Sequence, residues 1–245
     1  MTQEELIVYL QNRTSSSNHA KSTIAYNCSV SEKKVDAARR KVNADGLFKI
    51  SSGRGGGLSI SVGPEDELSV YKHFRPELEE WAIQNIYGRH GVTKLILGET
   101  HKTKLSGKWS TPDFSMICVH KFLHAPGAQL DVVSIEIKHT SKQFDVSCVY
   151  EALAHTRVSA FSVLCFYDPL HERNVEKHDG AVLEDIKSEC ATKGIGLVIS
   201  QYPTDVTKWH YLVPARRLIP DKRRVDAFIE EAFSHEQHKE LKKLL

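Results

Sequence analysis

The stretch VSIEIKHTS, residues 133–141, restricts the fold of this chain more than any other segment, because it has the pattern of a buried β-strand. Side chains alternate between the two faces of a strand, so residues two positions apart share a face. The Val and Ile residues of this segment lie on one face and indicate contact with a core, while Glu136 and Lys138 share the other. A charged pair on an otherwise apolar strand predicts either a solvent-facing surface or a functional site.

The composition and charge exclude several classes of protein. Of the 245 residues, 40% are hydrophobic and 26% charged, as in an ordinary soluble globular protein, and the net charge of +2 alone predicts no nucleic-acid partner. Neither a run of about 18 apolar residues nor the pattern of a signal peptide is present, so we expect no membrane partner. Five widely spaced cysteines without a CxxC pair fit reduced thiols in the cytoplasm better than disulfides or zinc.

The first part of the chain carries the signals of three helices. Residues 4–13 have a helical apolar stripe, and a short segment, 21–27, follows a polar break. The third helix has two candidate N-caps, since Ser29 has capping-box spacing with Glu32 and Ser31 is the alternative. The predicted inner stripe of this helix consists of Val35, Ala38 and Val42.

Residues 47–60, LFKISSGRGGGLSI, predict two short strands joined by a Gly-rich turn. Three helices followed by a hairpin is the order of a winged helix-turn-helix domain, which we expect over residues 1–62, with a linker at 63–75. The first 62 residues contain nine Lys or Arg and five Asp or Glu, a local charge of +4 that favours DNA phosphates. The expected DNA-binding residues are Lys33, Lys34, Arg39, Arg40 and Lys41 on the third helix and Arg54 at the hairpin tip. A solvated basic helix or a protein-binding module are the alternatives.

The remainder of the chain, residues 76–245, has the element order of an α/β domain. Pro76 predicts the start of a helix with Glu77, Glu79 and Glu80 in its first turn. Three strands, a helix, a strand, a helix and a further strand follow, an order that predicts an α/β sandwich around a mixed central sheet.

Two short motifs in this region resemble the signature of the PD-(D/E)XK nuclease superfamily. PDF at 112–114 precedes EIK at 136–138, and Pro-Asp followed by acid-X-Lys is the pattern of that family. Each motif lies on the element where the family has it, and the resemblance covers roughly residues 76–200. It implies a restriction-endonuclease-like fold and catalytic residues Asp113, Glu136 and Lys138. It also implies Mg²⁺, with Mn²⁺ as a substitute, bound by Asp113, Glu136 and the backbone carbonyl of Ile137.

The chemistry of phosphodiester hydrolysis explains why these residue types occur together. A divalent ion held by carboxylates activates water and neutralises charge on the scissile phosphate, and Mg²⁺ prefers hard oxygen ligands. Lys138 would orient or deprotonate the attacking water, or stabilise the developing negative charge. Work as a base would require burial to lower its pKa. The alternative is a solvated Glu-Lys pair on an edge strand, with TPD as an ordinary turn.

Several other polar residues have open roles. Many members of the family use an acidic residue of the first helix in the site. Glu77, Glu79 and Glu80 are the candidates here, and the sequence does not choose among them. The helix after EIK carries a functional polar residue in some members of the family, and Glu151 or His155 is the candidate here, but we expect both to lie on the surface. We expect Asp131 to be a turn residue. In the C-terminal region, an amphipathic helix through Phe233 is expected to pack on the core or on a second subunit. Arg216, Arg217, Arg223 and Arg224 either hold a DNA backbone or form a solvated basic turn.

These observations favour a metal-dependent DNA endonuclease with a winged helix for target recognition. A restriction or defence role follows by analogy with this architecture. Double-stranded DNA is the expected partner, and a homodimer would allow both strands to be cut. The alternative is a non-catalytic winged-helix transcriptional regulator, in which the nuclease-like domain serves as a sensor or dimerisation module.

Overall fold

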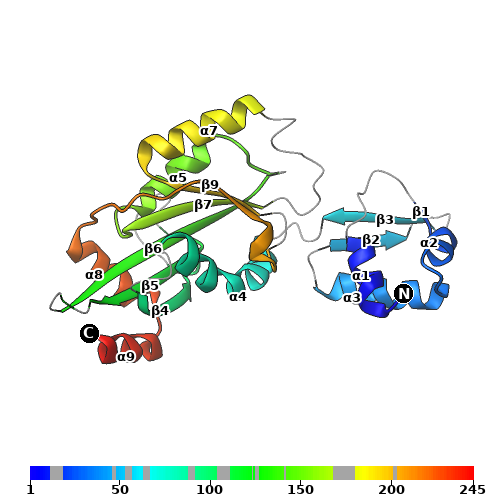
Figure 1. Cartoon of the computed structure of the whole chain (residues 1–245), viewed down its shortest axis with the longest axis horizontal. Coiled ribbons are helices and arrows are strands. Elements are labelled where there is room, and N and C mark those ends of the chain that lie inside the picture. The colour runs from blue at the N-terminus through cyan, green and yellow to red at the C-terminus, as the bar shows by residue number, and fades with distance from the viewer. Residues whose placement is uncertain are drawn as a thin grey trace. The chain divides into compact units, whose positions relative to one another are not determined.

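The computed structural model describes residues 1–11, 19–45, 48–52, 57–62, 67–87, 92–103, 111–122, 124, 127–140, 142–167, 180–200 and 203–245. These residues divide into two compact units, with the division between Phe74 and Arg75 (Figure 1). Among the described residues, no helix combines the length and the hydrophobicity that crossing a bilayer requires.

The first unit combines three helices with a small antiparallel sheet of strand order β1-β3-β2. Its elements are α1 (Gln3–Gln11), β1 (His19–Ala20), α2 (Lys21–Asn27), α3 (Glu32–Asp45), β2 (Phe48–Ser52) and β3 (Gly57–Val62). The predicted helices and hairpin are confirmed. β1 was not predicted, because two residues are too few to show an alternating pattern.

The α3 helix forms as its sequence predicts. Val35, Ala38 and Val42 are fully buried, which confirms the inner stripe. The structure decides between the two N-caps, because the Ser31 hydroxyl accepts a hydrogen bond from the Lys34 N–H at 3.4 Å. Ser29 instead adopts a positive φ of 52° in the turn before the helix.

The second unit is built on a mixed six-stranded sheet of order β4-β5-β6-β7-β8-β9. Its strands are β4 (Val92–Glu99), β5 (Phe114–Lys121), β6 (Ala128–His139), β7 (Phe161–Tyr167), β8 (Gly196–Ser200) and β9 (Trp209–Val213). The β6–β7 and β7–β8 pairs are parallel and the other neighbours are antiparallel. The α/β architecture with a mixed central sheet is thereby confirmed.

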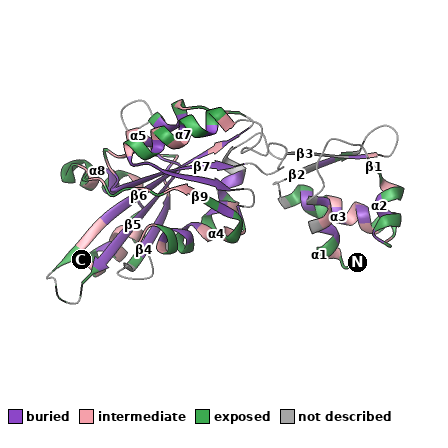
Figure 2. Ribbon diagram, turned by 45° about the horizontal axis from the view of Figure 1, so that its top comes forward, coloured by how far each residue is buried: buried purple, intermediate pink, exposed green. Residues whose placement is uncertain are grey.

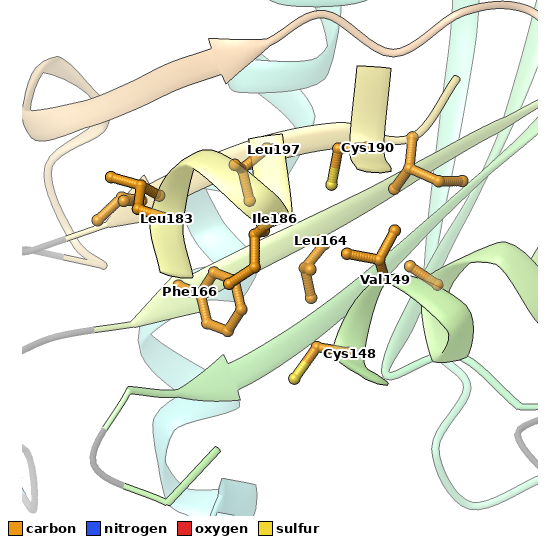
Figure 3. Packing of buried hydrophobic residues seen from close by; sticks show 11 residues of the cluster. Cys148, Val149, Leu164, Phe166, Leu183, Ile186, Cys190 and Leu197 are labelled. Atoms are coloured by element: carbon orange, nitrogen blue, oxygen red, sulfur yellow. The ribbon is translucent and has the colours of Figure 1, made fainter. Parts of the chain in front are cut away.

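Helices α5 (Ser147–His155) and α7 (Gly180–Lys193) cover one face of this sheet (Figure 1). Leu164 and Phe166 of β7 lie under them in a buried apolar cluster. Figure 3 shows Val149 of α5 and Ile186 of α7 packed around these two side chains. Residues on the same face of neighbouring strands therefore lie beneath α5 and α7.

The C-terminal region forms two helices rather than the single one that we predicted. They are α8 (Lys222–Ala232) and α9 (His235–Leu244), preceded in the chain by the short 3-10 helix η1 (Val206–Lys208). The helix breaks because Ser234 starts α9 with a reciprocal capping box to Gln237. Phe228, Ile229 and Phe233 are buried against the sheet, so the apolar face of this region packs on the core.

The α4 helix (Glu67–Asn85) corrects a predicted boundary. We expected a helix to begin at Pro76, but Pro76 lies inside α4, and residues 67–75 of the expected linker are helical. Proline cannot donate to the carbonyl of Lys72 one turn earlier. Both residues are exposed, so water can satisfy this carbonyl, and the helix continues through the proline.

Candidate active site

The strand β6 occupies the middle of the sheet, between β5 and β7. Residues 131–137 of this strand are all buried (Figure 2), and Glu136 is only 6% exposed. Glu136 is paired in register with Leu164, so its side chain lies on the face that α5 and α7 cover. The solvated pair on an edge strand is therefore wrong for Glu136 and Lys138.

Four charged or polar side chains meet between β6 and α5: Glu136, Lys138, Glu151 and His155. We call them the α5–β6 cluster. The Lys138 Nζ lies 2.7 Å from Glu136 Oε1 and 2.6 Å from Glu151 Oε2. The His155 Nε2 lies 3.0 Å from Glu136 Oε2. Both oxygens of Glu136 are thus engaged, and Lys138 bridges two carboxylates.

The surface location that we expected for Glu151 and His155 is wrong. His155 is 1% exposed and the side chain of Glu151 is 13% exposed. The two residues are four apart on α5, so they lie on the same side of the helix and reach the same strand. A signal for His155 was present in the sequence, because it continues the buried stripe of Cys148 and Ala152 at helical spacing.

Electrostatics within the cluster hold both β6 residues in their charged forms. Burial raises the pKa of the Glu136 carboxyl, but His155 and Lys138 lower it, and the net direction is downward. Burial lowers the pKa of the Lys138 ammonium, but Glu136 and Glu151 raise it well above its ordinary value of 10.5. Lys138 is therefore a fixed cation at neutral pH, which favours charge stabilisation over work as a general base.

Asp113 lies beside the same segment of β6. It is 9% exposed, and its Oδ2 accepts a hydrogen bond of 2.7 Å from the Ile137 N–H. Phe114 pairs with Ile135, and extending that register by one residue brings Asp113 alongside Glu136. The structure thus brings together the two motifs, PDF and EIK, that the sequence separates.

The donor set at this position fits Mg²⁺ better than a metal held by side chains alone. Within the described residues, no three His, Cys, Asp or Glu side chains are arranged to hold a metal ion. Mg²⁺ usually binds through one or two carboxylates and keeps several waters. Asp113 and Glu136 supply those two carboxylates. Both carboxylates are already oriented by hydrogen bonds, Asp113 by the Ile137 N–H and Glu136 by His155.

The acids of the preceding helix are not part of this arrangement. Glu77, Glu79 and Glu80 make no contact with the α5–β6 cluster among the described residues. The position of the end of α4 is shown by Tyr87, which follows this helix and packs on Phe161 with ring centroids 5.4 Å apart. Phe161 pairs in register with Val133, on the opposite face of the sheet from Glu136.

Asp131 and two C-terminal arginines have structural contacts. Asp131 is not a turn residue, as we expected, but a buried residue of β6 that accepts two hydrogen bonds from Arg217, at 2.7 and 3.3 Å. Arg216 donates to the Ala191 and Thr192 carbonyls at 2.8 Å, which satisfies the C-terminus of α7.

The cations predicted to bind DNA fall into two groups on α3. Lys33, Arg40 and Lys41 are exposed, whereas Lys34 and Arg39 are half-buried. Lys34 donates to the Met1 carbonyl at 2.8 Å, and Arg39 lies 4.0 Å from Asp36. Lys21 of α2 pairs with two acids of α3, Glu32 at 3.5 Å and Asp36 at 2.9 Å. Arg54 lies outside the described residues.

Comparisons with known proteins find no relative of this chain. It matches no protein-family model, and neither the curated proteins nor the solved structures include one similar to it. The function is therefore inferred from the residues and their geometry.

Proposed function

We propose that this protein is a metal-dependent endonuclease that hydrolyses phosphodiester bonds of double-stranded DNA. The observation that carries the proposal is the buried Glu136–Lys138 pair on a central strand, with the carboxylate of Asp113 beside it. Burying charges is costly unless they are paired. A chain that places two carboxylates and a lysine at one point of its sheet has the groups that phosphoryl chemistry requires.

Each residue of the site has a distinct part in this mechanism. Asp113, Glu136 and the Ile137 carbonyl would hold Mg²⁺ or Mn²⁺, which supplies an activated water and neutralises phosphate charge. The Lys138 ammonium, fixed between Glu136 and Glu151, stabilises the negative charge that develops on the phosphate. His155 orients Glu136 through its Nε2.

The first unit supplies DNA binding in this proposal. Its order of helix, short strand, two helices and hairpin supports a winged helix, with α3 as the helix that enters the major groove. Lys33, Arg40 and Lys41 face outward and would contact DNA. Because Lys21 pairs with Glu32 and Asp36, the negative charge of these two acids opposes the phosphates less. A restriction or defence role in the cytoplasm fits such a pairing of units.

The test is cleavage of methylated and unmethylated genomic DNA with Mg²⁺, with Mn²⁺ and with EDTA. We expect metal-dependent cutting that falls at least about 100-fold in Glu136→Gln and in Lys138→Gln. Lys94→Gln is the matched control, because Lys94 forms an exposed pair with Glu240 and should cut normally. Circular dichroism and retained DNA binding would show that the inactive variants are folded.

A second candidate is a non-catalytic regulator that binds DNA through the first unit. The pairing of both Glu136 oxygens, one with Lys138 and one with His155, favours it, because a buried polar network can also have the purely structural role of rigidifying a core. Absence of cleavage under every metal condition, together with salt-dependent binding of duplex DNA, would support the regulator and contradict the nuclease.

A further inference from the structure

The charges of α8 run against the dipole of the helix. Cations are favoured near the C-terminus of a helix and anions near the N-terminus. In α8 the three cations occupy the first turn and the three acids come later: Lys222, Arg223, Arg224, Asp226, Glu230 and Glu231. The neighbouring α9 has the favoured order, with Glu236 in its first turn and Lys242 and Lys243 in its last.

These six charges are also without ion-pair partners in the part of the chain that the structure describes. All six residues are exposed, and none forms an ion pair with another described residue. The N-cap residue Asp221 accepts hydrogen bonds from the Arg223 and Arg224 N–H groups and compensates the dipole there, but no described residue forms an ion pair with the six side chains. A helix that separates its cations from its acids in this way is complementary to a partner with the reverse order of charge.

A second copy of the same helix has this complementary charge. Two helices related by a two-fold axis that crosses them at right angles run antiparallel, and the cationic turn of one then lies beside the acidic end of the other. Ala227 is the middle residue of α8 and is exposed and small, which allows close approach. If the helices cross there, Arg223 faces Glu231 of the second copy, and Arg224 faces its Glu230.

The surface beside α8 provides the apolar part of such an interface. A helix of 11 residues is about 16 Å long and alone covers far less than the roughly 1,200 Å² of a stable interface. A groove of about 540 Å³ runs between α8 and the start of β6, lined by Val225, Ile229 and Val132 among others. Ile219 at its rim is 90% exposed, more than any other large hydrophobic side chain described. The same patch thus carries both a projecting apolar side chain and a groove with apolar as well as polar walls, which a self-complementary interface can use.

We propose that α8, Ile219 and this groove form a two-fold interface with a second copy of the chain. DNA fits this surface less well, because Asp226, Glu230 and Glu231 would repel phosphates. The inference is independent of the nuclease chemistry, since it depends only on the charges and exposure of this patch.

A charge exchange tests the interface. We expect sedimentation velocity at low salt to give twice the monomer mass of 27.6 kDa for the unaltered protein. The double variant Arg223→Glu/Arg224→Glu and the double variant Glu230→Arg/Glu231→Arg should each raise the dissociation constant at least about 100-fold. Mixing the two double variants, or combining all four changes in one chain, should restore the dimer. Ile219→Glu should weaken it as well.

The control is Lys242→Glu/Lys243→Glu on α9, which changes exposed charges outside the patch and should leave the dimer intact. Circular dichroism should show unchanged helix content in every variant. A protein that stays monomeric at about 50 µM and low salt would overturn the proposal. A dimer that survives both double variants, or one that neither mixing nor the fourfold exchange restores, would overturn it too.

Discussion

At the scale of single residues, Lys138 and Glu136 show how burial and pairing act together. Two carboxylates hold the Lys138 ammonium, while Lys138 and His155 hold the Glu136 carboxylate. Each charge would be costly alone at this depth, because the low local dielectric disfavours an unpaired ion. Removing any one member therefore takes one partner away from at least one other charged group, and the effects of substitutions within the cluster should not be additive.

His155 should act as a positioning residue for Glu136. We expect His155→Ala to weaken Mn²⁺ binding, measured by calorimetry, by about 10- to 100-fold, as is usual for residues that orient a metal ligand. His155→Gln should retain most of the affinity, because its amide can still donate to Glu136. His210→Ala removes an exposed histidine of β9 and is the matched control. Unchanged Mn²⁺ affinity in His155→Ala would contradict the positioning role.

The lowered pKa of Glu136 predicts how stability depends on pH. A carboxyl group whose pKa is lower in the folded protein contributes stability that is complete above its ordinary value of 4.5. That contribution is lost as the pH falls through the lower folded value. Urea unfolding from about pH 7 to about pH 3 should therefore show a steeper acid loss in the unaltered protein than in Glu136→Gln. Parallel curves would show that Glu136 does not titrate as inferred.

The sequence predicted three of the five residues of the candidate site, and the two that it missed lie on α5. Asp113, Glu136 and Lys138 were identified because short motifs carry them. Glu151 and His155 were missed because charged and polar side chains of a helix are usually exposed, so both were expected on the surface. The buried face of α5 consists of Cys148, Val149, Ala152 and His155, so a histidine takes part in the packing of the helix on the sheet.

At the scale of elements, the alternation and apolar runs predicted the strands β2 to β8, but not the two-residue β1. Local sequence patterns did not predict β1 or the start of α4, because contacts with distant residues or with solvent determine these two features. β1 exists only because it pairs with β3, and α4 passes through Pro76 because its exposed side can lose one hydrogen bond. The α8–α9 break was visible in principle, since Ser234 and Gln237 have capping-box spacing.

The start of α9 offers a test of how capping stabilises this region. The Ser234 hydroxyl accepts from the Gln237 N–H at 3.3 Å, and Gln237 also donates to the Leu97 carbonyl of β4 at 2.9 Å. We expect Ser234→Ala to lower the free energy of unfolding by about 1 kcal/mol in urea titrations. Gln237→Ala should cost more, because it also removes the bond to β4. Ser188→Ala, at an exposed position of α7, is the control and should change little. The reverse order of the two effects would contradict this account.

At the scale of the whole molecule, the reactivity of the cysteines can be used to follow the unfolding of each unit separately. Cys28 is the single cysteine of the first unit, while the second contains Cys118, Cys148, Cys165 and Cys190. All five are buried free thiols, and burial raises the pKa of Cys118 to about 12. Since the thiolate is the reactive form, native thiols should label slowly for two reasons, low access and low ionisation.

Thiol labelling at increasing urea concentrations should therefore resolve the unfolding of the two units. We expect Cys28 to become reactive at lower urea than the other four, because a smaller unit buries a smaller fraction of its surface. Mass spectrometry of labelled peptides would assign each site, and Cys28→Ser should remove only the early phase. All five thiols should react after complete unfolding without reductant, since none forms a disulfide. If all five instead become reactive at the same urea concentration, the two units unfold together in one cooperative transition. The division at residue 74 would then separate two sets of contacts but not two independently unfolding units.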